Sequence, residues 1–195
     1  LFRSSISFNM LFLEEIWSRN FTNLFIAPLK VSEIITALTA TALIRTLIGI
    51  VPAVLLASPF FGVSLLNLGP ALILLLLSLY FFGITLGLFV VSGLLRYGPA
   101  FENVAWSSLF LLAPLGCIYY PLSILPEWLQ VLAKTLPLVY IFEEVRSILM
   151  DNVVNYKNIM IALILNSIYF VSAIVTFYSA FNEARKKGTL INVGE

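Results

Sequence analysis

The chain has 195 residues, of which 61% are hydrophobic and 11% are charged, and its mean hydropathy is +1.02. Soluble domains carry about 25% charged residues, so this composition excludes an ordinary soluble protein and favours an all-α bundle of membrane helices. The net charge of +1 and the absence of histidine argue against a nucleic-acid partner and exclude a histidine-based metal site or base. The single cysteine, Cys117, is expected to pack as a small apolar side chain.

The amino-terminal part mixes charged and aromatic residues. Leu1–Leu13 is interrupted by Arg3 and is too short to span a membrane. After it, Trp17, Phe21, Leu24 and Phe25 recur at spacings of three and four, which places them on one face of a helix that Pro28 ends. The length suits an interfacial helix that lies along the membrane surface.

Four apolar runs are predicted to cross a hydrocarbon core of roughly 30 Å, which takes about 20 helical residues. They are Val31–Ala57, Ala71–Leu95, a run from Val104 to Tyr120, and Ile159–Phe181. In the second run, Gly83 and Gly87 form a small-xxx-small pair that favours close helix packing.

Arg45 lies near the middle of the first predicted span. A cation at that depth costs about 2.5–3.5 kcal/mol by insertion scales, so its side chain should face protein, water or a carboxylate. Two interpretations stay open: a cavity-lining residue that contacts an anionic substrate, and a structural pair or snorkelling side chain. After the second span, Arg96 and Glu102 flank a Gly-Pro turn and are candidates to pair with each other or with a partner protein.

The third span is followed by a proline-broken stretch. Pro121, Pro126 and Pro137 separate two short amphipathic pieces, of which the first carries Trp128. The second piece carries Glu143, Glu144 and Arg146. Neither piece can span, and broken helices at membrane depth survive only where protein or a wet cavity surrounds them. We therefore expect a re-entrant helical hairpin at the outer end of the third span.

The distribution of cations predicts the orientation. Arg3, Arg19, Lys30, Arg96, Arg185, Lys186 and Lys187 fall on one side of the predicted spans, and Lys134, Arg146 and Lys157 on the other. The richer side is cytoplasmic by the positive-inside rule, which places both ends of the chain in the cytoplasm.

No catalytic motif is present in the sequence. It has no P-loop and no Gly-x-Ser-x-Gly elbow, so it cannot hydrolyse ATP by the P-loop route. The carboxylates Glu143, Glu144 and Asp151 could serve acid–base chemistry, but they also fit a solvated helix face. The residues themselves therefore indicate no enzyme.

An ordered string of short patterns resembles a known family. Phe101-Glu102-Asn103 precedes the third span, Ala113-Pro114-Leu115-Gly116 lies inside it, and Tyr120-Pro121-Leu122 and Leu125-Pro126-Glu127-Trp128-Leu129-Gln130 follow. Leu136-Pro137-Leu138 and Glu144-Val145-Arg146 complete the string. Together they are similar to the permease subunit of ABC-2 type transporters, the second type of ATP-binding-cassette exporter. The likeness extends more loosely over residues 1–195, read as a single transmembrane domain.

The resemblance implies roles for particular residues. The family has six spans, so the chain is expected to be a fragment that lacks the first span and most of the second. The amino-terminal interfacial helix corresponds to the helix that couples to the ATPase, with the residues Glu14, Glu15, Arg19, Phe21, Leu24, Phe25 and Pro28. Asn20 stands where the family usually has glycine. The broken stretch corresponds to an outer gate, with the residues Pro121, Pro126, Trp128, Pro137, Glu143, Glu144 and Arg146.

The function implied is export of an amphiphilic cargo, such as a lipid-linked glycan or a drug, through a multi-pass protein of the prokaryotic plasma membrane. A separate ATP-binding subunit would bind ATP and Mg, and this chain would bind no cofactor. A second permease copy, identical or different, would complete the path. The alternatives are a membrane scaffold without transport and a membrane-embedded enzyme.

Overall fold

The computed structural model describes Met10, Leu11, Glu14 and residues 31–61, 70–98, 101–151 and 153–187. In this part of the chain there is no β-strand. The six helices with described bounds are α3 (Val31–Phe61), α4 (Pro70–Tyr97), α5 (Glu102–Leu115), α6 (Glu127–Ala133), α7 (Pro137–Asp151) and α8 (Tyr156–Lys187), and the short 3-10 helix η3 (Leu122–Ile124) precedes α6. The prediction of an all-helical chain is confirmed for these residues.

Three of the helices are long and apolar enough to cross a membrane. The candidate spans are Ser32–Leu56 in α3, Ile73–Tyr97 in α4 and Tyr156–Lys186 in α8. At about 1.5 Å per residue, each exceeds the roughly 30 Å of a hydrocarbon core. They agree with three of the four predicted spans, and the chain is a multi-pass integral membrane protein.

The remaining predicted span is shorter than expected. Helix α5 has 14 residues and ends at Leu115 instead of Tyr120. Its length of about 21 Å, at about 1.5 Å per residue, is less than a hydrocarbon core. The helix ends because Cys117 adopts a φ of 54°, a left-handed conformation that turns the chain out of the helical path. The described residues therefore hold three candidate spans and one shorter apolar helix, in place of four complete spans.

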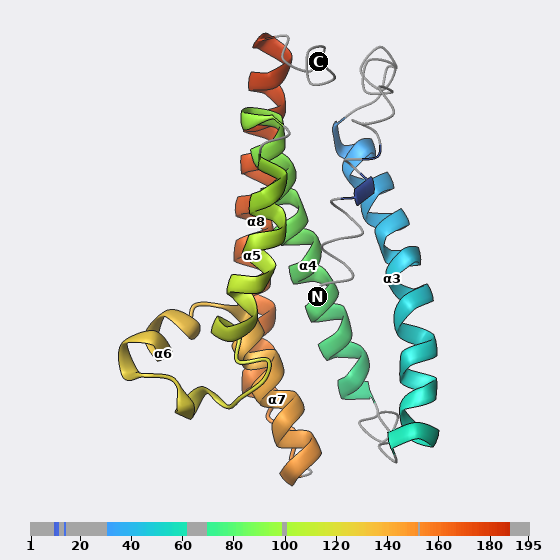
Figure 1. The fold of residues 1–195 in the computed structure, drawn as a ribbon, viewed down its shortest axis with the longest axis vertical. Helices are drawn as coiled ribbons and strands as arrows, with labels where there is room; N and C mark the ends of the chain where they lie inside the picture. Colours follow the sequence, from blue (N-terminus) through green and yellow to red (C-terminus); the bar gives the residue numbers. More distant parts are fainter. Residues whose placement is uncertain are drawn as a thin grey trace.

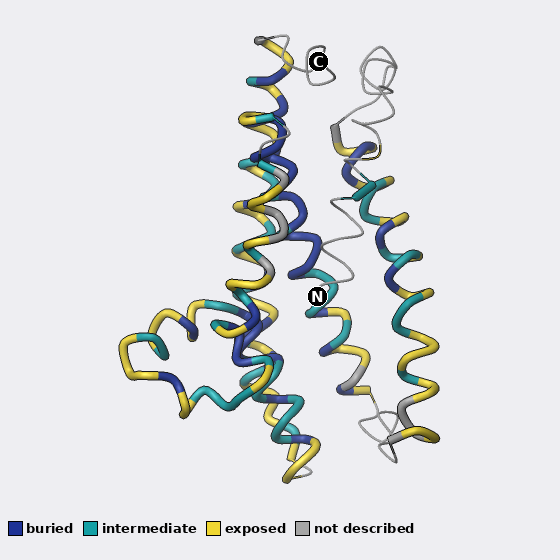
Figure 2. Tube along the Cα trace, viewed as in Figure 1, coloured by how far each residue is buried: buried dark blue, intermediate teal, exposed yellow. Residues whose placement is uncertain are grey.

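Helix α4 is the central helix of the structure (Figures 1 and 2). Half of its most apolar window is buried, compared with 17% for α3 and 22% for α8. Along α8 the exposed side chains form an apolar stripe at spacings of three and four, made of Met160, Leu163, Ile164, Ile168, Val171 and Val175. Such a stripe is typical of a helix face in contact with lipid.

The tightest contact in the structure joins α4 to α8. Leu88, Val91 and Leu94 of α4 share one buried cluster with Phe177 and Ala180 of α8. Further along the pair, Asn166 of α8 is fully buried and its Nδ2 donates hydrogen bonds to the Oγ and carbonyl oxygen of Ser78, at 2.7 and 3.0 Å. Apolar packing and an interhelical hydrogen bond together fix α8 against α4.

The two ends of the bundle differ in chemistry. At one end, here called the basic end, Arg96 of α4 forms an ion pair with Glu183 of α8 at 3.5 Å and donates to Ser179 Oγ at 2.9 Å. At the other end, here called the hairpin end, lie α6 and α7 (Figure 1). There, Ile141 and Ile148 of α7 share a buried cluster with residues of α4 and α8.

Candidate gate at the broken segment

The residues between α5 and α7, 116–136, are here called the broken segment. The two prolines inside it mark element boundaries, since Pro121 precedes η3 and Pro126 precedes α6, and Pro137 directly after it is the first residue of α7. Pro121 and Pro126 have extended backbone, with ψ of 153° and 148°. Since proline has no backbone N–H and disfavours a helical conformation in the residue before it, these positions keep the segment from continuing as one helix.

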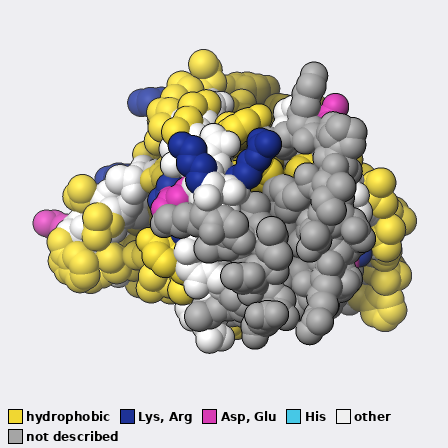
Figure 3. Space-filling view, turned by 90° about the horizontal axis from the view of Figure 1, so that it is seen from above, with side chains coloured by type: hydrophobic (Ala, Val, Ile, Leu, Met, Phe, Trp, Pro, Cys, Tyr) yellow, Lys and Arg dark blue, Asp and Glu magenta, His cyan; other side chains and the backbone are white. Residues whose placement is uncertain are grey.

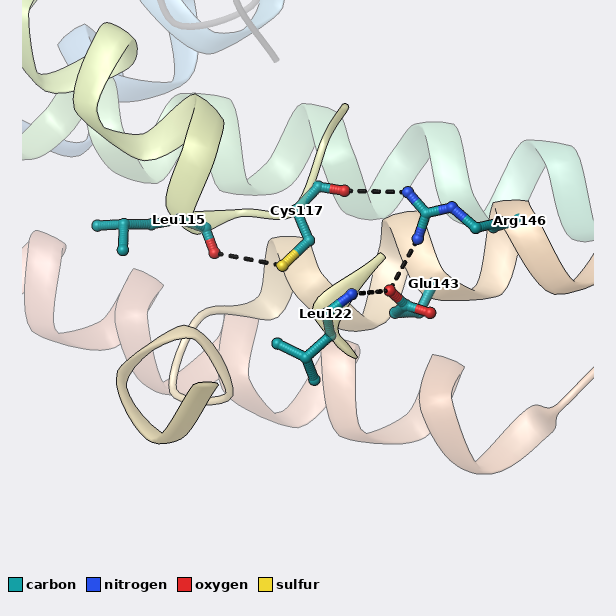
Figure 4. Close-up of polar contacts among 5 residues, drawn as sticks. All are labelled: Leu115, Cys117, Leu122, Glu143 and Arg146. Carbon is teal, nitrogen blue, oxygen red and sulfur yellow. Dashed lines mark hydrogen bonds and ion pairs between the residues drawn. The ribbon is translucent and has the colours of Figure 1, made fainter. Parts of the chain in front are cut away.

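Two side chains of α7 hold the start of the broken segment (Figure 4). Glu143 Oε1 accepts hydrogen bonds from the backbone N–H of Leu122 at 2.8 Å and from Arg146 Nη1 at 2.7 Å. Arg146 Nη2 donates to the carbonyl oxygen of Cys117 at 3.2 Å. These four residues are here called the clasp. Because the two backbone groups lie on either side of the turn 118–121, the clasp fixes both ends of that turn to α7.

The ion pair within the clasp is only partly exposed. The side chains of Arg146 and Glu143 are 22% and 31% exposed. Salt screens a partly buried ion pair less than one on an open surface, and both charged groups also bond to backbone groups. The clasp is therefore a specific polar attachment rather than a surface ion pair of negligible energy.

Cys117, whose carbonyl oxygen belongs to the clasp, is fully buried. Its Sγ is 3.8 Å from the carbonyl oxygen of Leu115. Burial, and secondarily the charge of Glu143, raises the pKa of the thiol above its ordinary value. Since the thiolate is the reactive form, this cysteine is protected from thiol reagents while the broken segment stays in place.

Gly116 shows how closely the broken segment meets α7. A Cβ atom at this position would lie 2.9 Å from Leu138 Cδ1 and 3.0 Å from the carbonyl oxygen of Leu112. The site has no room for a side chain without movement of its neighbours, so glycine permits this close approach.

Glu144 does not lie on a solvated helix face, which was one of the alternatives that the sequence left open. It is fully buried, and its two carboxylate oxygens accept hydrogen bonds from the backbone N–H of Asn155 at 2.6 Å and from Asn158 Nδ2 at 3.2 Å. Asn155 in turn caps α8, since its Oδ1 accepts from the N–H of Lys157 at 3.2 Å. Glu144 thus attaches α7 to the first turn of α8, where the helix dipole favours a carboxylate.

Helix α6 presents apolar side chains outward. Trp128, Val131 and Leu132 are exposed, while Ala133 is buried in a cluster with Cys117 and Val139. The helix has only seven residues, so it cannot span. An exposed tryptophan with apolar neighbours on a short helix is typical of a membrane–water interface.

Arg45, the predicted cavity candidate, faces a carboxylate. Its Nη1 and Nη2 atoms bond to the two oxygens of Glu14, at 3.2 and 3.0 Å. Arg45 lies about 21 Å along α3 from Val31, at about 1.5 Å per residue, and Glu14 lies beside it. The described contacts therefore make a two-bond ion pair. A contact between Arg45 and a substrate stays a prediction.

At the basic end, sequence analysis left open whether Arg96 pairs with Glu102. Arg96 pairs with Glu183, a residue that the sequence did not single out, and the side chain of Glu102 lies outside the described residues. Asn166 was also overlooked, although an amide inside an apolar run was a signal that the helix buries that face against another helix.

The chain was compared with protein families, curated proteins and solved structures. Residues 1–150 match the model of the ABC-2 type transporter family. The chain belongs to this family. No curated protein and no solved structure matches it. The family assignment confirms the resemblance, and it confirms that the chain is a membrane permease domain without ATPase activity of its own.

The predicted coupling residues of this ABC-2 domain remain untested, with Glu14 as the partial exception. Glu15, Arg19, Phe21, Leu24, Phe25 and Pro28 lie outside the described residues. Glu14 is helical and paired with Arg45, which places it beside the middle of α3. The structure thus gives Glu14 a partner inside this chain.

Proposed function

We propose that this ABC-2 domain is the membrane subunit of an ATP-driven exporter and that the broken segment is its outer gate. It works with a separate ATP-binding subunit, which binds ATP and Mg, and with a second permease copy. The single observation that supports the gate is the clasp: two charged side chains of α7 hold backbone groups of a non-helical turn at the hairpin end.

The energy of the clasp suits a gate. It consists of three hydrogen bonds, and each involves a charged side chain, for which the net contribution is about 1.5–3 kcal/mol. Each bond is therefore comparable with the coupling free energies of about 1–3 kcal/mol that connect distant sites in proteins. Such an attachment keeps the segment closed at rest and yields when nucleotide binding favours the open state.

The driving force comes from the ATP-binding subunit. Its closure on ATP pushes the predicted coupling residues, among them Glu15, Arg19 and Pro28. ATP binds more tightly to the closed state of the ATP-binding subunit, and the open gate is coupled to that state. ATP therefore shifts the equilibrium from the closed to the open gate. Both ends of the chain lie in the cytoplasm, the membrane is the prokaryotic plasma membrane, and the cargo is an amphiphile such as a lipid-linked glycan or a drug.

Cys117, the only cysteine of the chain, provides the test of the gate. The permease is assembled with its ATP-binding subunit in cells or oriented vesicles, and an impermeant maleimide is added from outside. Without ATP, labelling should be slow, because the thiol is buried and its pKa is raised. With ATP, we expect at least about tenfold faster labelling.

The controls separate opening of the gate from simple accessibility. Val131→Cys in a Cys117→Ser background places the thiol on the exposed face of α6 and should label equally fast with and without ATP. Arg146→Gln removes the bond to the carbonyl of Cys117 and should speed labelling of Cys117 even without ATP. The gate would be contradicted if Val131→Cys is labelled fast while the labelling rate of Cys117 is the same with and without ATP. Labelling of Val131→Cys only from the cytoplasm would reverse the orientation.

The coupling role has an independent test. Glu15→Ala combined with Arg19→Ala, in the complex with the ATP-binding subunit, should weaken association of the two subunits and abolish the ATP dependence of Cys117 labelling. Unchanged co-purification together with an unchanged ATP dependence would remove these residues from the coupling helix, while leaving the gate untouched.

A further inference from the structure

The basic end of α8 contains a hollow that the transport proposal does not use. It has a volume of about 400 Å³ and is lined by Asn182, Arg185 and Lys186. The end view in Figure 3 shows Lys and Arg side chains gathered at this end of the molecule. Since the three residues are spaced three and four apart on one helix, they share one face of α8.

This face points away from the packed interior. Phe177, Ala180, Phe181 and Ala184 lie on the opposite side of the same turns and are buried against the cluster that includes α4. Arg185 and Lys186 are exposed. Among the described residues, the hollow therefore lies on the outer face of α8 and is not a gap between α4 and α8.

The cations at the basic end differ in whether an acidic side chain pairs with them. Arg96 is neutralised by Glu183 on one flank of α8. Within the described residues, no such ion pair is found for Arg185 or Lys186. Two cations and an amide thus converge on the hollow, and guanidinium and ammonium groups are the side chains that bind phosphate most often in proteins.

The depth of the hollow identifies the source of that phosphate. Continued by the exposed Tyr178, the apolar stripe that begins at Met160 extends over about 27 Å at about 1.5 Å per residue, which accounts for nearly the whole hydrocarbon core of roughly 30 Å. Asn182 and Arg185 lie about 6 and 10 Å beyond Tyr178 on the same scale. That position falls in the headgroup layer of the bilayer rather than in open solvent.

We propose that Asn182, Arg185 and Lys186 bind the phosphate of an anionic phospholipid in the leaflet at the basic end. The lipid would hold the last turns of α8 at a fixed depth, in addition to the attraction that any anionic surface exerts on cations. The proposal requires only that α8 is inserted in the membrane, so it does not depend on the gate or on the coupling helix.

The test measures lipid binding to the full chain purified in neutral detergent, by native mass spectrometry and by thermal unfolding. Phosphatidylglycerol should remain bound and raise the unfolding temperature, whereas phosphatidylcholine with the same acyl chains and inorganic phosphate should do neither. In Arg185→Gln/Lys186→Gln, the affinity for phosphatidylglycerol should fall by about 25-fold, from roughly fivefold per cation near an anionic surface. The matched control, Lys134→Gln/Lys157→Gln, removes two exposed cations at the hairpin end and should bind as the wild type does.

The proposal would be overturned by equal phosphatidylglycerol affinity in the two double variants, by equal retention of phosphatidylcholine, or by equal stabilisation by inorganic phosphate, which would indicate a soluble-anion site. If Arg185→Gln/Lys186→Gln does not fold, Arg185→Lys/Lys186→Arg and Asn182→Leu replace it. The first should keep the affinity because it keeps both charges, and the second should lower it.

In the wild type, retention of phosphatidylglycerol should decline as salt is raised from 0.05 to 0.5 M, since screening weakens exposed charge contacts. Salt-independent retention would contradict the site.

Discussion

Helices α3 and α4 have similar length and similar apolar character, yet they hold different positions. They contain 31 and 28 residues, and both are candidate spans. In α4 half of the most apolar window is buried, against 17% in α3. Lipid is as apolar as leucine, so hydrophobicity cannot decide which helix takes the centre of a membrane bundle. Burial of small and polar residues against other helices favours the central position, and in α4 Ser78, Gly87 and Gly93 are all buried.

The residues of α4 and α8 illustrate this. Gly83, Gly87 and Gly93 of α4 are buried, as are Ala173 and Ala180 of α8. Small side chains let helix backbones approach closely and gain van der Waals contact. The small-residue face of α4 is thus covered inside the subunit. In α3, by contrast, Ile44, Leu47, Ile48 and Val51 form an exposed face of large side chains.

The largest effect should come from the centre of the α4–α8 contact. Phe177→Ala removes a fully buried ring and should lower the free energy of unfolding by about 3–5 kcal/mol, as large cavity-forming substitutions do. Val175→Ala, on the lipid-facing side of the same helix, should cost far less. Denaturant unfolding in micelles measures both, and equal losses would mean that the two faces of α8 are not distinct.

The second-largest loss in the free energy of unfolding should come from overpacking at α4. A Cβ at position 93 would lie 2.0 Å from Phe101 Cε1, so Gly93→Val should destabilise the protein by about 1–3 kcal/mol. Phe101→Ala in the same chain should recover part of this loss, because the ring is the obstacle. Strictly additive losses in the double variant, by the same unfolding assay, would show that the clash lies elsewhere.

The polar contact between α4 and α8 should contribute less. Asn166→Leu removes both bonds to Ser78 and should cost about 0.6 kcal/mol, and no more than about 1.7 kcal/mol, the range for interhelical hydrogen bonds in membranes. Ser167→Leu changes the neighbouring exposed residue and should be close to neutral. If Ser167→Leu costs as much as Asn166→Leu, the interhelical bond is not what stabilises the pair.

The smallest effect is expected on α3. Ile48 is 66% exposed, so Ile48→Ala should change the free energy of unfolding of the purified chain by less than about 0.5 kcal/mol. A loss comparable with that of Phe177→Ala would mean that another protein surface covers this face of α3. The difference in burial between α3 and α4 would then hold only for the isolated chain.

Much of the fold could be predicted from the sequence because long apolar runs have few alternatives in a membrane. The bounds of α3, α4 and α8 lie within a few residues of the predicted spans, although α8 continues further into its charged end. Helix α5 was predicted too long because Cys117-Ile118-Tyr119-Tyr120 continues the apolar run. Hydropathy carries no information on the positive φ of Cys117, which depends on contacts with α7.

The candidate site was predictable in composition and only partly in geometry. The prolines and the charges of α7 marked the broken segment correctly as a place of interrupted helices. The family resemblance assigned both Glu143 and Glu144 to the outer gate, but adjacent helical residues point about 100° apart. Glu143 therefore meets the clasp, whereas Glu144 meets the start of α8. Likewise, the sequence predicted that Arg45 faces protein, water or a carboxylate, while the pairing with Glu14 depended on tertiary structure.

The attachment of α8 at both of its ends has a mechanical consequence. Glu144 holds its first turn to α7, and Arg96 holds its last turns to α4 through Glu183. A rod of 32 residues, about 48 Å long at about 1.5 Å per residue, that is fastened at top and bottom cannot swing on its own. We expect α4, α7 and α8 to stay fixed relative to one another. We expect α3 on one side and the stretch leading into α6 on the other to move relative to these three helices.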